Sequence, residues 1–435
     1  MKTLKKLVLF STLICNCLIV LSQESAVDIK YKRSSLHTLM ISDLEQEYID
    51  TIQNIFINAP LIDKFNNHIV KNRLIPKTDS TFVYIPASEE EDKPKKKSGF
   101  LSKIKIKSEK KQDEEAHKHL AILNYLNTNG IAKEMVAKWF NRSETGGFNM
   151  DLIAERGYYN ASDLDVKIAN SSERGSALLA DAGEALIKNT FVIVNDFKYT
   201  NKEEVATKAK GLLSAIGDVA ALAGKDDIAN AATLTSAGVE VAGKGYVIKT
   251  KAHLYKLAWT DEVAAIFYND FWTDDAALDQ SKVDAFNNTN IFKFEYVGTE
   301  TSWADIQSTS FTKKSNADLI SVATVRAVDN VIAKLQREFE VFRTKTPLLS
   351  SDPLSAKIGL KEGLEKGDKY EVLEQVLNEN GVVEYKRLGV IKVEKDLIWD
   401  NRFNANEENT SELEYTTFSG SKNKYYAGML IRQIN

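Results

Sequence analysis

The fold is decided by a strand-forming stretch in the middle of the chain, FVIVNDF at residues 191–197. β-Branched and aromatic residues fill most of its positions, which is typical of a strand buried in a sheet. A second stretch of this kind, Tyr246–Trp259, follows an Ala/Gly-rich segment at residues 211–245. Because consecutive strands usually lie side by side, we expect these two to be neighbours in one sheet.

Helical patterns flank these strands and extend the same unit. Ser315 stands at the N-cap position of the longest apolar helical face, which continues toward Pro347. Thr260 is predicted to cap a shorter helix, and residues 291–297 alternate like a strand. The sequence therefore predicts an α+β fold whose central mixed-sheet domain occupies residues 116–346.

Residues 347–435 change to a β pattern. Tyr370–Leu377 alternates apolar and polar residues, and Asn380-Gly381 is a strong signal for a hairpin turn. Several short strands in so few residues predict a small β-barrel-like or curled antiparallel sheet domain. The last predicted strand, at residues 425–434, ends almost at the final residue, so we expect the terminus to be tied into that sheet.

The first residues, 1–22, are predicted to form a secretory signal peptide. Three lysines precede an apolar run from Leu7 to Leu21, and small residues at Val20 and Ser22 allow cleavage before Gln23. The run is short for a spanning helix, although an uncleaved anchor is the alternative. We therefore expect an exported protein, located in the periplasm, on the outer membrane or outside the cell.

Both cysteines of the chain, Cys15 and Cys17, lie inside this leader. Neither follows the small residue that acylation of a bacterial lipoprotein needs, so they read as ordinary apolar-region residues with lipidation as the alternative. Cleavage would leave a mature chain without cysteine. We expect that chain to be stabilised by burial of apolar side chains and to perform no thiol chemistry.

Residues 23–88 are predicted to form an N-terminal helical segment. A capping box at residues 42–45 and an apolar face at residues 44–56 indicate its first helix. A second helix is predicted at residues 65–74 and a strand at residues 81–85. The charged run at residues 89–115 predicts a solvated linker, because so little apolar surface cannot offset the chain entropy of folding.

Charge excludes one class of partner. The formal net charge is −4, and removal of the three leader lysines leaves about −7. A mildly acidic chain lacks the positive field that binds phosphates along nucleic acid, so we expect no nucleic-acid partner. The basic half of the linker permits peripheral contact with an anionic membrane surface, with a solvated loop as the alternative.

The Ala/Gly-rich segment at residues 211–245 is predicted to be a tight helical hairpin. The small residues Gly217, Ala221 and Gly224 would let two helices approach closely, as in membrane helix pairs. Charged residues interrupt the segment before it reaches the length of a bilayer crossing. A soluble hairpin is favoured, and an envelope-assembly or membrane-active function is the alternative.

Sequence signals for catalysis are weak. The chain contains no HExxH, GxSxG or phosphate-loop motif, and no histidine set has the spacing of a metal site, so no cofactor is expected. Asp270, Asp274 and Asp275 surround Trp272, and a glycosidase needs two carboxylates in an aromatic-lined cleft. A carboxylate-based hydrolase is thus a second alternative, against solvated loop acids as the simpler interpretation.

The stretches Met150–Ala161, Gly183–Val192 and Asp261–Trp272 follow one another in an order that resembles exported or envelope proteins of Bacteroidetes bacteria with no assigned activity. The resemblance covers roughly residues 115–435. It implies a Gram-negative envelope or secreted location and assigns no functional residue. Taken together, the sequence favours a non-catalytic exported protein that acts by binding or scaffolding, with an envelope protein or a surface ligand as its partner.

Overall fold

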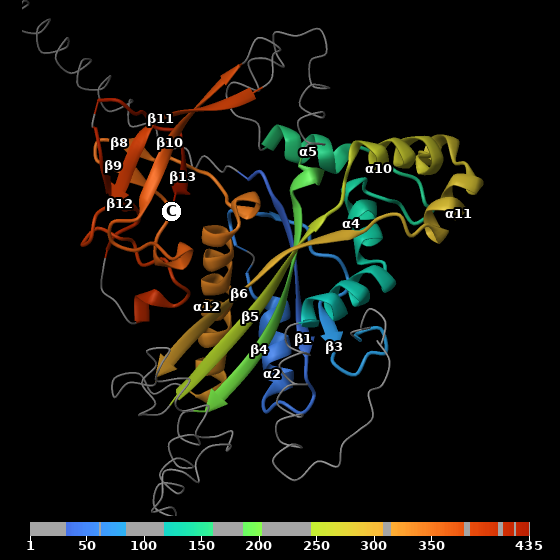
Figure 1. The fold of residues 1–435 in the computed structure, drawn as a ribbon, viewed down its shortest axis with the longest axis horizontal. Coiled ribbons are helices and arrows are strands. Elements are labelled where there is room, and N and C mark those ends of the chain that lie inside the picture. The colour runs from blue at the N-terminus through green and yellow to red at the C-terminus, as the bar shows by residue number, and fades with distance from the viewer. Residues whose placement is uncertain are drawn as a thin grey trace, which may run out of the picture.

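The computed structural model describes residues 32–60, 62–83, 117–159, 186–201, 245–307, 315–377, 383–407, 412–421 and 423–434. They form an α+β protein with a mixed sheet and a curled antiparallel sheet, as the sequence predicts (Figure 1). The mixed sheet contains β1 (Ser35–Ser42), β2 (Asn66–Asn67), β3 (Leu74–Pro76), β4 (Thr190–Asn201), β5 (Gly245–Leu257) and β6 (Phe294–Gln307).

Strand order in the mixed sheet is β2-β1-β4-β5-β6, with β3 also paired to β1. β4 and β5 are antiparallel neighbours over their whole length, from Phe191 opposite Lys256 to Asn201 opposite Tyr246. This confirms the pairing predicted from the two apolar stretches. β6 continues the antiparallel meander, whereas β1 lies parallel to β4 on the other side.

The sequence did not predict β1. Four of its eight residues are polar (Ser35, His37, Thr38 and Ser42), yet all eight positions are buried between neighbouring strands of the sheet. The expected helix after it exists as α2 (Ile49–Asn58), but the capping box at residues 42–45 is wrong because helix α2 begins later. The helix predicted at residues 65–74 is also wrong: β2 and β3 occupy that range. Residues 81–83 of the predicted strand form a turn.

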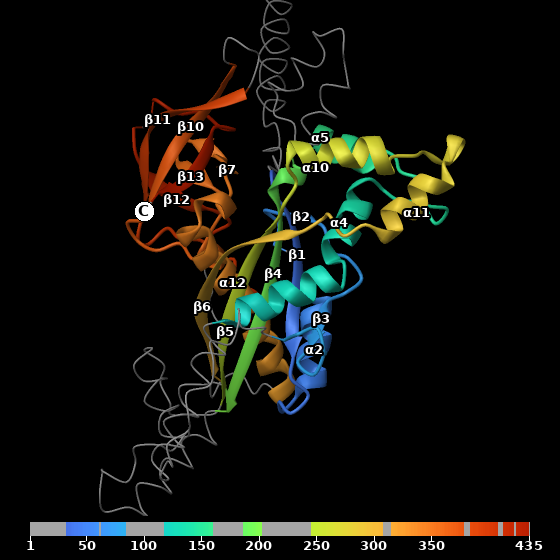
Figure 2. The ribbon, with the colours of Figure 1, turned by 45° about the vertical axis from the view of Figure 1, so that its right-hand side comes forward.

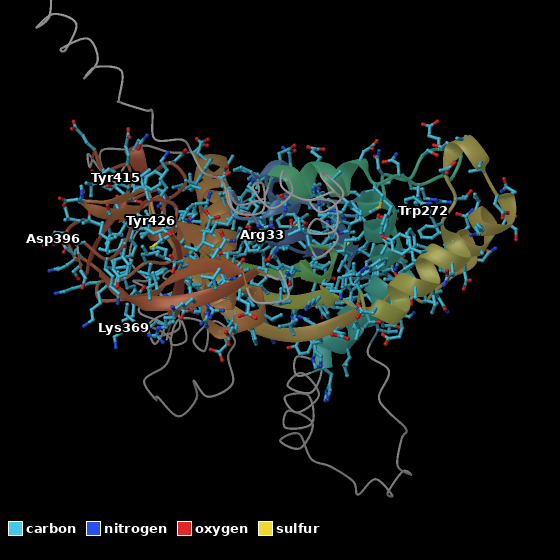
Figure 3. All side chains as sticks on the ribbon, turned by 90° about the horizontal axis from the view of Figure 1, so that it is seen from above. Arg33, Trp272, Lys369, Asp396, Tyr415 and Tyr426 are labelled. Carbon is cyan, nitrogen blue, oxygen red and sulfur yellow. The ribbon has the colours of Figure 1, made fainter. Side chains whose placement is uncertain are left out.

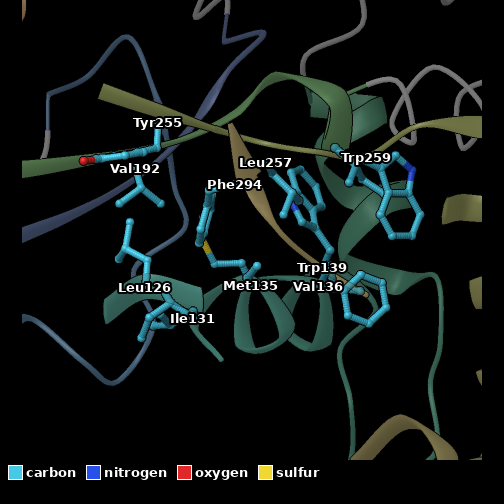
Figure 4. Close-up of a cluster of buried hydrophobic side chains, with 14 of the residues drawn as sticks. Leu126, Ile131, Met135, Val136, Trp139, Val192, Tyr255, Leu257, Trp259 and Phe294 are labelled. Atoms are coloured by element: carbon cyan, nitrogen blue, oxygen red, sulfur yellow. The ribbon is translucent and has the colours of Figure 1, made fainter. Parts of the chain in front are cut away.

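Helices cover both faces of this sheet (Figure 2). On one face α2 and α12 (Asn316–Glu338) pack on Met40, Phe197 and Ile248. On the other face the helical residues 117–128 and α4 (Ile131–Trp139) pack on β-strand side chains, as the close-up in Figure 4 shows. Burial on both faces explains why β4 reads as an unbroken apolar run, since successive side chains enter opposite cores.

The prediction that Ser315 caps the longest helix is confirmed. Its hydroxyl accepts the Asp318 amide at 3.2 Å, and the Asp318 carboxylate accepts the Ser315 amide at 3.2 Å.

Farther along, α12 also reaches the edge strand β6. Lys334 donates to the Thr301 carbonyl at 2.8 Å, and Asn330 donates to the Trp303 carbonyl at 3.4 Å. These side chains occupy backbone acceptors at the open edge of β6.

A helical lobe is inserted between β5 and β6 and projects from one end of the sheet (Figures 1 and 2). It contains α10 (Asp261–Ile266), a π-helical turn (Phe267–Phe271), a 3-10 turn (Asp275–Ala277) and α11 (Gln280–Asn288). The predicted cap is confirmed, because the Thr260 hydroxyl accepts the Val263 amide at 3.2 Å. Aromatic rings fill the base of this lobe.

The C-terminal part is a seven-stranded half-barrel with the order β7-β13-β10-β11-β12-β9-β8. Its strands are β7 (Thr346–Pro347), β8 (Ser350–Ser351), β9 (Leu354–Ala356), β10 (Lys369–Leu377), β11 (Val383–Val393), β12 (Thr416–Ser419) and β13 (Leu430–Ile434). β10 and β11 form the predicted hairpin, while Asn380-Gly381 lies outside the described residues. β13 pairs with β10, so the tie of the chain end into the sheet is confirmed.

The half-barrel is fastened to α12. Arg337 forms an ion pair with Asp368 at 2.8 Å, and Arg326 donates twice to the Phe403 carbonyl, at 2.8 and 3.0 Å. The 3-10 turn Leu360–Glu362 packs on the same helix. These contacts join the half-barrel to the central layers by hydrogen bonds as well as by packing.

Several predicted segments lie outside the described residues: the leader at residues 1–22, the linker at residues 89–115 and most of the hairpin at residues 211–245. Among the helices that the structure does describe, none combines the length and the apolar character needed to cross a bilayer.

Candidate functional site

The predicted carboxylate cluster lies on the helical lobe, where Asp270, Asp274 and Asp275 are all exposed. Asp274 accepts the Ala277 amide at 2.8 Å and so caps the 3-10 turn. Asp275 accepts the hydroxyls of Ser143 at 2.7 Å and Thr145 at 2.6 Å. The Thr145 and Ser143 hydrogen bonds lower the pKa of the Asp275 carboxyl.

Trp272 belongs to the aromatic core at the base of the lobe rather than to a cleft beside these acids. Its ring stacks on Phe148 with a centroid distance of 6.0 Å and meets Phe140 edge-on at 5.8 Å. Asp274 and Asp275 therefore hold a turn and a loop in place. All three acids are exposed, whereas a glycosidase needs two carboxylates held in an aromatic-lined cleft.

The other predicted residues, Gly217, Ala221 and Gly224, lie outside the described residues. The structure therefore neither places their helices nor brings them near another site. Among the residues that it does describe, no group of three or more histidine, cysteine or acidic side chains could hold a metal ion.

A buried histidine cluster joins α5 (Asp151–Tyr159) to α4 and β1. The Arg156 guanidinium lies over the Trp139 ring at 4.5 Å and is 2.9 Å from Nδ1 of His68. His68 Nε2 lies 2.9 Å from the Met135 carbonyl, and Arg156 also donates to the Asn67 carbonyl at 2.7 Å. These bonds connect three elements and give the cluster a structural role.

Burial keeps both histidines of this region neutral. Loss of solvation and the nearby Arg156 hold the pKa of His68 well below its usual value. Burial and the Arg73 charge lower the pKa of His37 to about 3. Both imidazoles are therefore neutral near pH 7.

A second polar cluster, which we call the basic junction, lies where the half-barrel meets the segment after α12. It consists of Arg33, Lys345, Arg387 and Arg432 around the carboxylate of Glu371 and the ring of Tyr385. Figure 3 places Arg33 between the half-barrel, which carries Lys369, and the helical lobe, which carries Trp272. The ion pairs of Glu371 with Arg387 and Arg432, the contact of Lys345 with Tyr385, and the influence of Arg33 and Arg432 on Lys345 bring cations from four separate segments together.

Glu371 is the buried anion of the basic junction, with 5% of its surface exposed. Arg432, opposite it on β13, donates to it at 2.6 Å, and Arg387 on β11 lies 3.8 Å away. Arg432 also reaches the exposed Glu340 at 3.2 Å. The two carboxylates are thus already shared between arginines.

Lys345 is the cation that these carboxylates do not bind. Its Nζ lies 4.2 Å from the centroid of the Tyr385 ring, and in the described part of the chain it has no hydrogen bond or ion pair. Burial, followed by the charges of Arg432 and Arg33, lowers the pKa of Lys345 to about 8. The Lys345 ammonium therefore loses solvation here without gaining a hydrogen bond or an ion pair in the described residues.

Sequence reasoning missed the basic junction. The strands that carry Glu371 and Arg432 were predicted, but their register pairs positions that are far apart in the chain. A cross-strand ion pair becomes visible only when that register is known. The one local signal is a glutamate in the middle of an alternating strand, flanked by Tyr370 and Val372.

Fold and site define a class rather than a family. The chain is an α+β protein with a helix-covered mixed sheet, a curled half-barrel and a positively charged cluster where they meet. Comparison with known proteins adds no closer assignment: no family model matches the chain, and no curated protein matches it.

Proposed function

We propose that this is an exported, non-catalytic binding protein whose ligand carries a carboxylate or phosphate group and binds at the basic junction. One observation supports this most: the partly buried Lys345 ammonium lies over the Tyr385 ring and has no hydrogen bond or ion pair in the described residues. Burying a charge is costly unless it is paired. An anion beside Lys345 would remove that cost and so gain binding free energy.

The surroundings of Lys345 favour the same ligand. Arg432 is held in place by Glu371 and Glu340, so its guanidinium is pre-oriented within the junction. Arginine and lysine together are the usual recognition groups for carboxylate and phosphate oxygens. The acidic net charge of the whole chain does not oppose this, because a local field is screened over about 8 Å at physiological salt.

Thermal unfolding of the mature chain in the presence of inorganic phosphate or citrate tests the binding proposal. A ligand that binds only the folded state stabilises it by about 2.7 kcal/mol at a hundred times its Kd. We expect a saturable rise in Tm for the wild type that is lost in Lys345→Met. The exposed Lys386 on β11 provides the matched control. Equal rises in Lys345→Met and Lys386→Met would contradict the proposal.

Export is supported by the lysines and apolar run of residues 1–22 and by the resemblance to exported proteins. Expression of the full chain in a Gram-negative host, followed by fractionation and intact mass measurement, tests it. The expected product is a periplasmic, outer-membrane or secreted chain that begins at Gln23. An unprocessed chain in the cytosol would contradict export.

The membrane-active alternative stays tied to residues 211–245 and is tested separately. Flotation of the mature chain with vesicles that contain anionic lipid distinguishes the two ideas. If the protein stays at the bottom of the gradient, the result favours a soluble binding protein. Flotation that is abolished by deleting residues 211–245 would favour the alternative instead.

A further inference from the structure

We infer that the ligand of the basic junction is an acidic segment of a partner protein, bound in an extended conformation with carboxylates at alternate residues. This deepens the proposed function and rests on it, because the same cations would hold the ligand. It adds the chemical class of the partner. It also adds a second group of cations, on the outer face of the half-barrel, that the proposed function does not use.

The outer face of the half-barrel is the side of its sheet that turns away from the apolar core. Tyr370 of β10 and Ile391 of β11 both enter that core. Because successive strand residues point to opposite faces, their neighbours Lys369, Glu371 and Lys392 lie on the outer face. This face therefore continues from the basic junction, whose central carboxylate is Glu371, to two further lysines.

Lys369 and Lys392 form a like-charged pair on the outer face. The register of β10 and β11 places them directly opposite each other, and both are exposed. Like charges at such positions destabilise a sheet. In the described part of the chain neither ammonium has a hydrogen bond or an ion pair. An anion between them would relieve this repulsion, so the pair is a second place for an acidic group.

The two groups of cations have the spacing of an extended peptide. Lys369 is two residues from Glu371, which accepts from Arg432 at 2.6 Å, so the lysine pair lies about 7 Å along the strands from the junction. Side chains i and i+2 of an extended peptide project from one side at the same spacing. One carboxylate of such a peptide would meet the lysine pair and the next would meet the junction.

The carboxylates on this face favour a peptide over a lipid surface. Glu371 lies next to both groups of cations, and Glu340, with 71% of its side chain exposed, borders Arg432 at 3.2 Å. A continuous layer of phosphate headgroups would be repelled by both acids, whereas a peptide presents its charges at separate positions. The cations of the face outnumber its acids, which disfavours a second copy of this chain bound through the same face.

Two synthetic peptides of equal composition and charge test the inference. One is a fluorescein-labelled octapeptide in which glutamate and threonine alternate, so that its carboxylates share one side when it is extended. The other carries the same four glutamates as a block, followed by the four threonines. Binding of each to the folded mature chain is measured by fluorescence anisotropy at low and at physiological salt.

We expect the alternating peptide to bind about tenfold more tightly than the block peptide, because each exposed ion pair contributes no more than roughly fivefold. Both affinities should fall as the salt concentration rises. The double variant Lys369→Met, Lys392→Met should lose the preference for the alternating peptide. Its Tm should equal or exceed that of the wild type, because the like-charged pair is gone. A lost preference would therefore not reflect lost folding.

Two single variants complete the test. Lys345→Met should weaken the binding of the alternating peptide, since it removes the cation of the junction. Lys386→Met is the matched control, because Lys386 pairs with Glu374 in register and so lies on the other face of the hairpin. We expect it to bind both peptides as the wild type does.

The outcomes separate this inference from the proposed function. Equal binding of the two peptides, or a preference that survives loss of Lys369 and Lys392, would overturn the inference. The proposed function would still stand if phosphate raised Tm in a Lys345-dependent way, and both would fall if it did not.

Other occupants would also show themselves. Flotation with vesicles of phosphatidylglycerol and phosphatidylcholine that depends on Lys369 and Lys392, without peptide binding, would point to a lipid surface. A dimer in light scattering that the double variant abolishes would point to a second copy. Either result would contradict the acidic peptide.

Discussion

The strands of the mixed sheet and those of the half-barrel differ in how many of their faces are buried. In the mixed sheet, helices cover both faces, so successive residues of β4 enter two apolar cores. In the half-barrel, Tyr370 and Val372 of β10 face its one core, and Glu371 between them points to the other side. A strand with one covered face leaves the other face available for charged groups. The candidate site accordingly belongs to the half-barrel.

The largest effect is expected in the apolar core that covers one face of the mixed sheet, at Phe140 directly after α4. This ring is fully buried and stacks on Phe267 with a centroid distance of 4.2 Å. Phe140→Ala should lower the free energy of unfolding by about 3–5 kcal/mol, because it removes contacts and leaves a cavity. Urea unfolding monitored by tryptophan fluorescence measures this.

Val341→Ala is the control for that variant, since Val341 is 46% exposed and should change stability by less than about 1 kcal/mol. Hydrogen exchange sharpens the comparison. We expect Phe140→Ala to weaken protection mainly in the mixed sheet. An equal loss in β10 and β11 would show that the two sheets unfold as one unit.

A smaller but distinct effect is expected at Glu371 in the half-barrel. Glu371→Gln removes the anion that holds Arg432, and it should cost about 2–3 kcal/mol because this partly buried guanidinium loses its partner, whereas the exposed Arg387 adds little. A double-mutant cycle with Arg432→Met measures the coupling. Glu340→Gln, at a carboxylate with 71% exposure, should cost less than about 1 kcal/mol. A coupling near zero would contradict the assigned ion pair.

The contact between the two regions should respond to pH through Asp329 on α12. Burial raises the pKa of its carboxyl to about 7, with Lys361, Glu362, Asp63 and Arg326 as its charged neighbours. The folded state therefore holds this proton more tightly than the unfolded state. The proton on Asp329 therefore contributes stability that is fully present below about pH 4 and is lost as the pH rises through about 7.

Asp329→Asn should remove that pH dependence and, since the pKa is raised by about three units, make the protein about 4 kcal/mol more stable than the wild type above pH 7. Urea midpoints measured from pH 5 to pH 8 check it. If the two proteins keep parallel profiles over this range, the buried carboxyl of Asp329 does not control the contact. Asp63→Asn removes an exposed charge that itself raises the pKa of Asp329, so it should lower that pKa slightly and keep most of the pH dependence.

The smallest effect is expected at the start of the helix that serves both regions. Ser315→Ala removes the hydroxyl of the capping box and should cost about 1 kcal/mol. Ser321→Ala lies in the same helix away from its end and should stay within about 0.5 kcal/mol of the wild type. Thermal unfolding distinguishes the two. Similar losses in both would contradict the capping role.

Local patterns predicted the elements whose signal lies in neighbouring residues. The run at residues 191–197 indicated β4, and Ser315 and Thr260 indicated helix starts that the structure confirms. β1 was not predicted because the polar residues Ser35 and His37 interrupt its apolar pattern, although both are buried. Tertiary burial overrides propensity at such positions.

The candidate site was less predictable than the fold for a physical reason. Asp275 finds its hydroxyl partners more than a hundred residues earlier in the chain, at Ser143 and Thr145. Glu371 finds Arg432 across a strand pair whose register is set by the whole half-barrel. Interactions of this kind depend on chain packing, which a single sequence read locally does not specify.

The α12 side chains that cover β6 have a consequence for the behaviour of the protein at high concentration. An exposed sheet edge is a template on which a second chain can add a strand and begin an aggregate. Lys334 and Asn330 occupy the Thr301 and Trp303 carbonyls, so a foreign strand would have to displace them before it could pair. Replacing both residues with alanine would free these two carbonyls for strand pairing. Light scattering of concentrated samples should then show more aggregation than for the wild type.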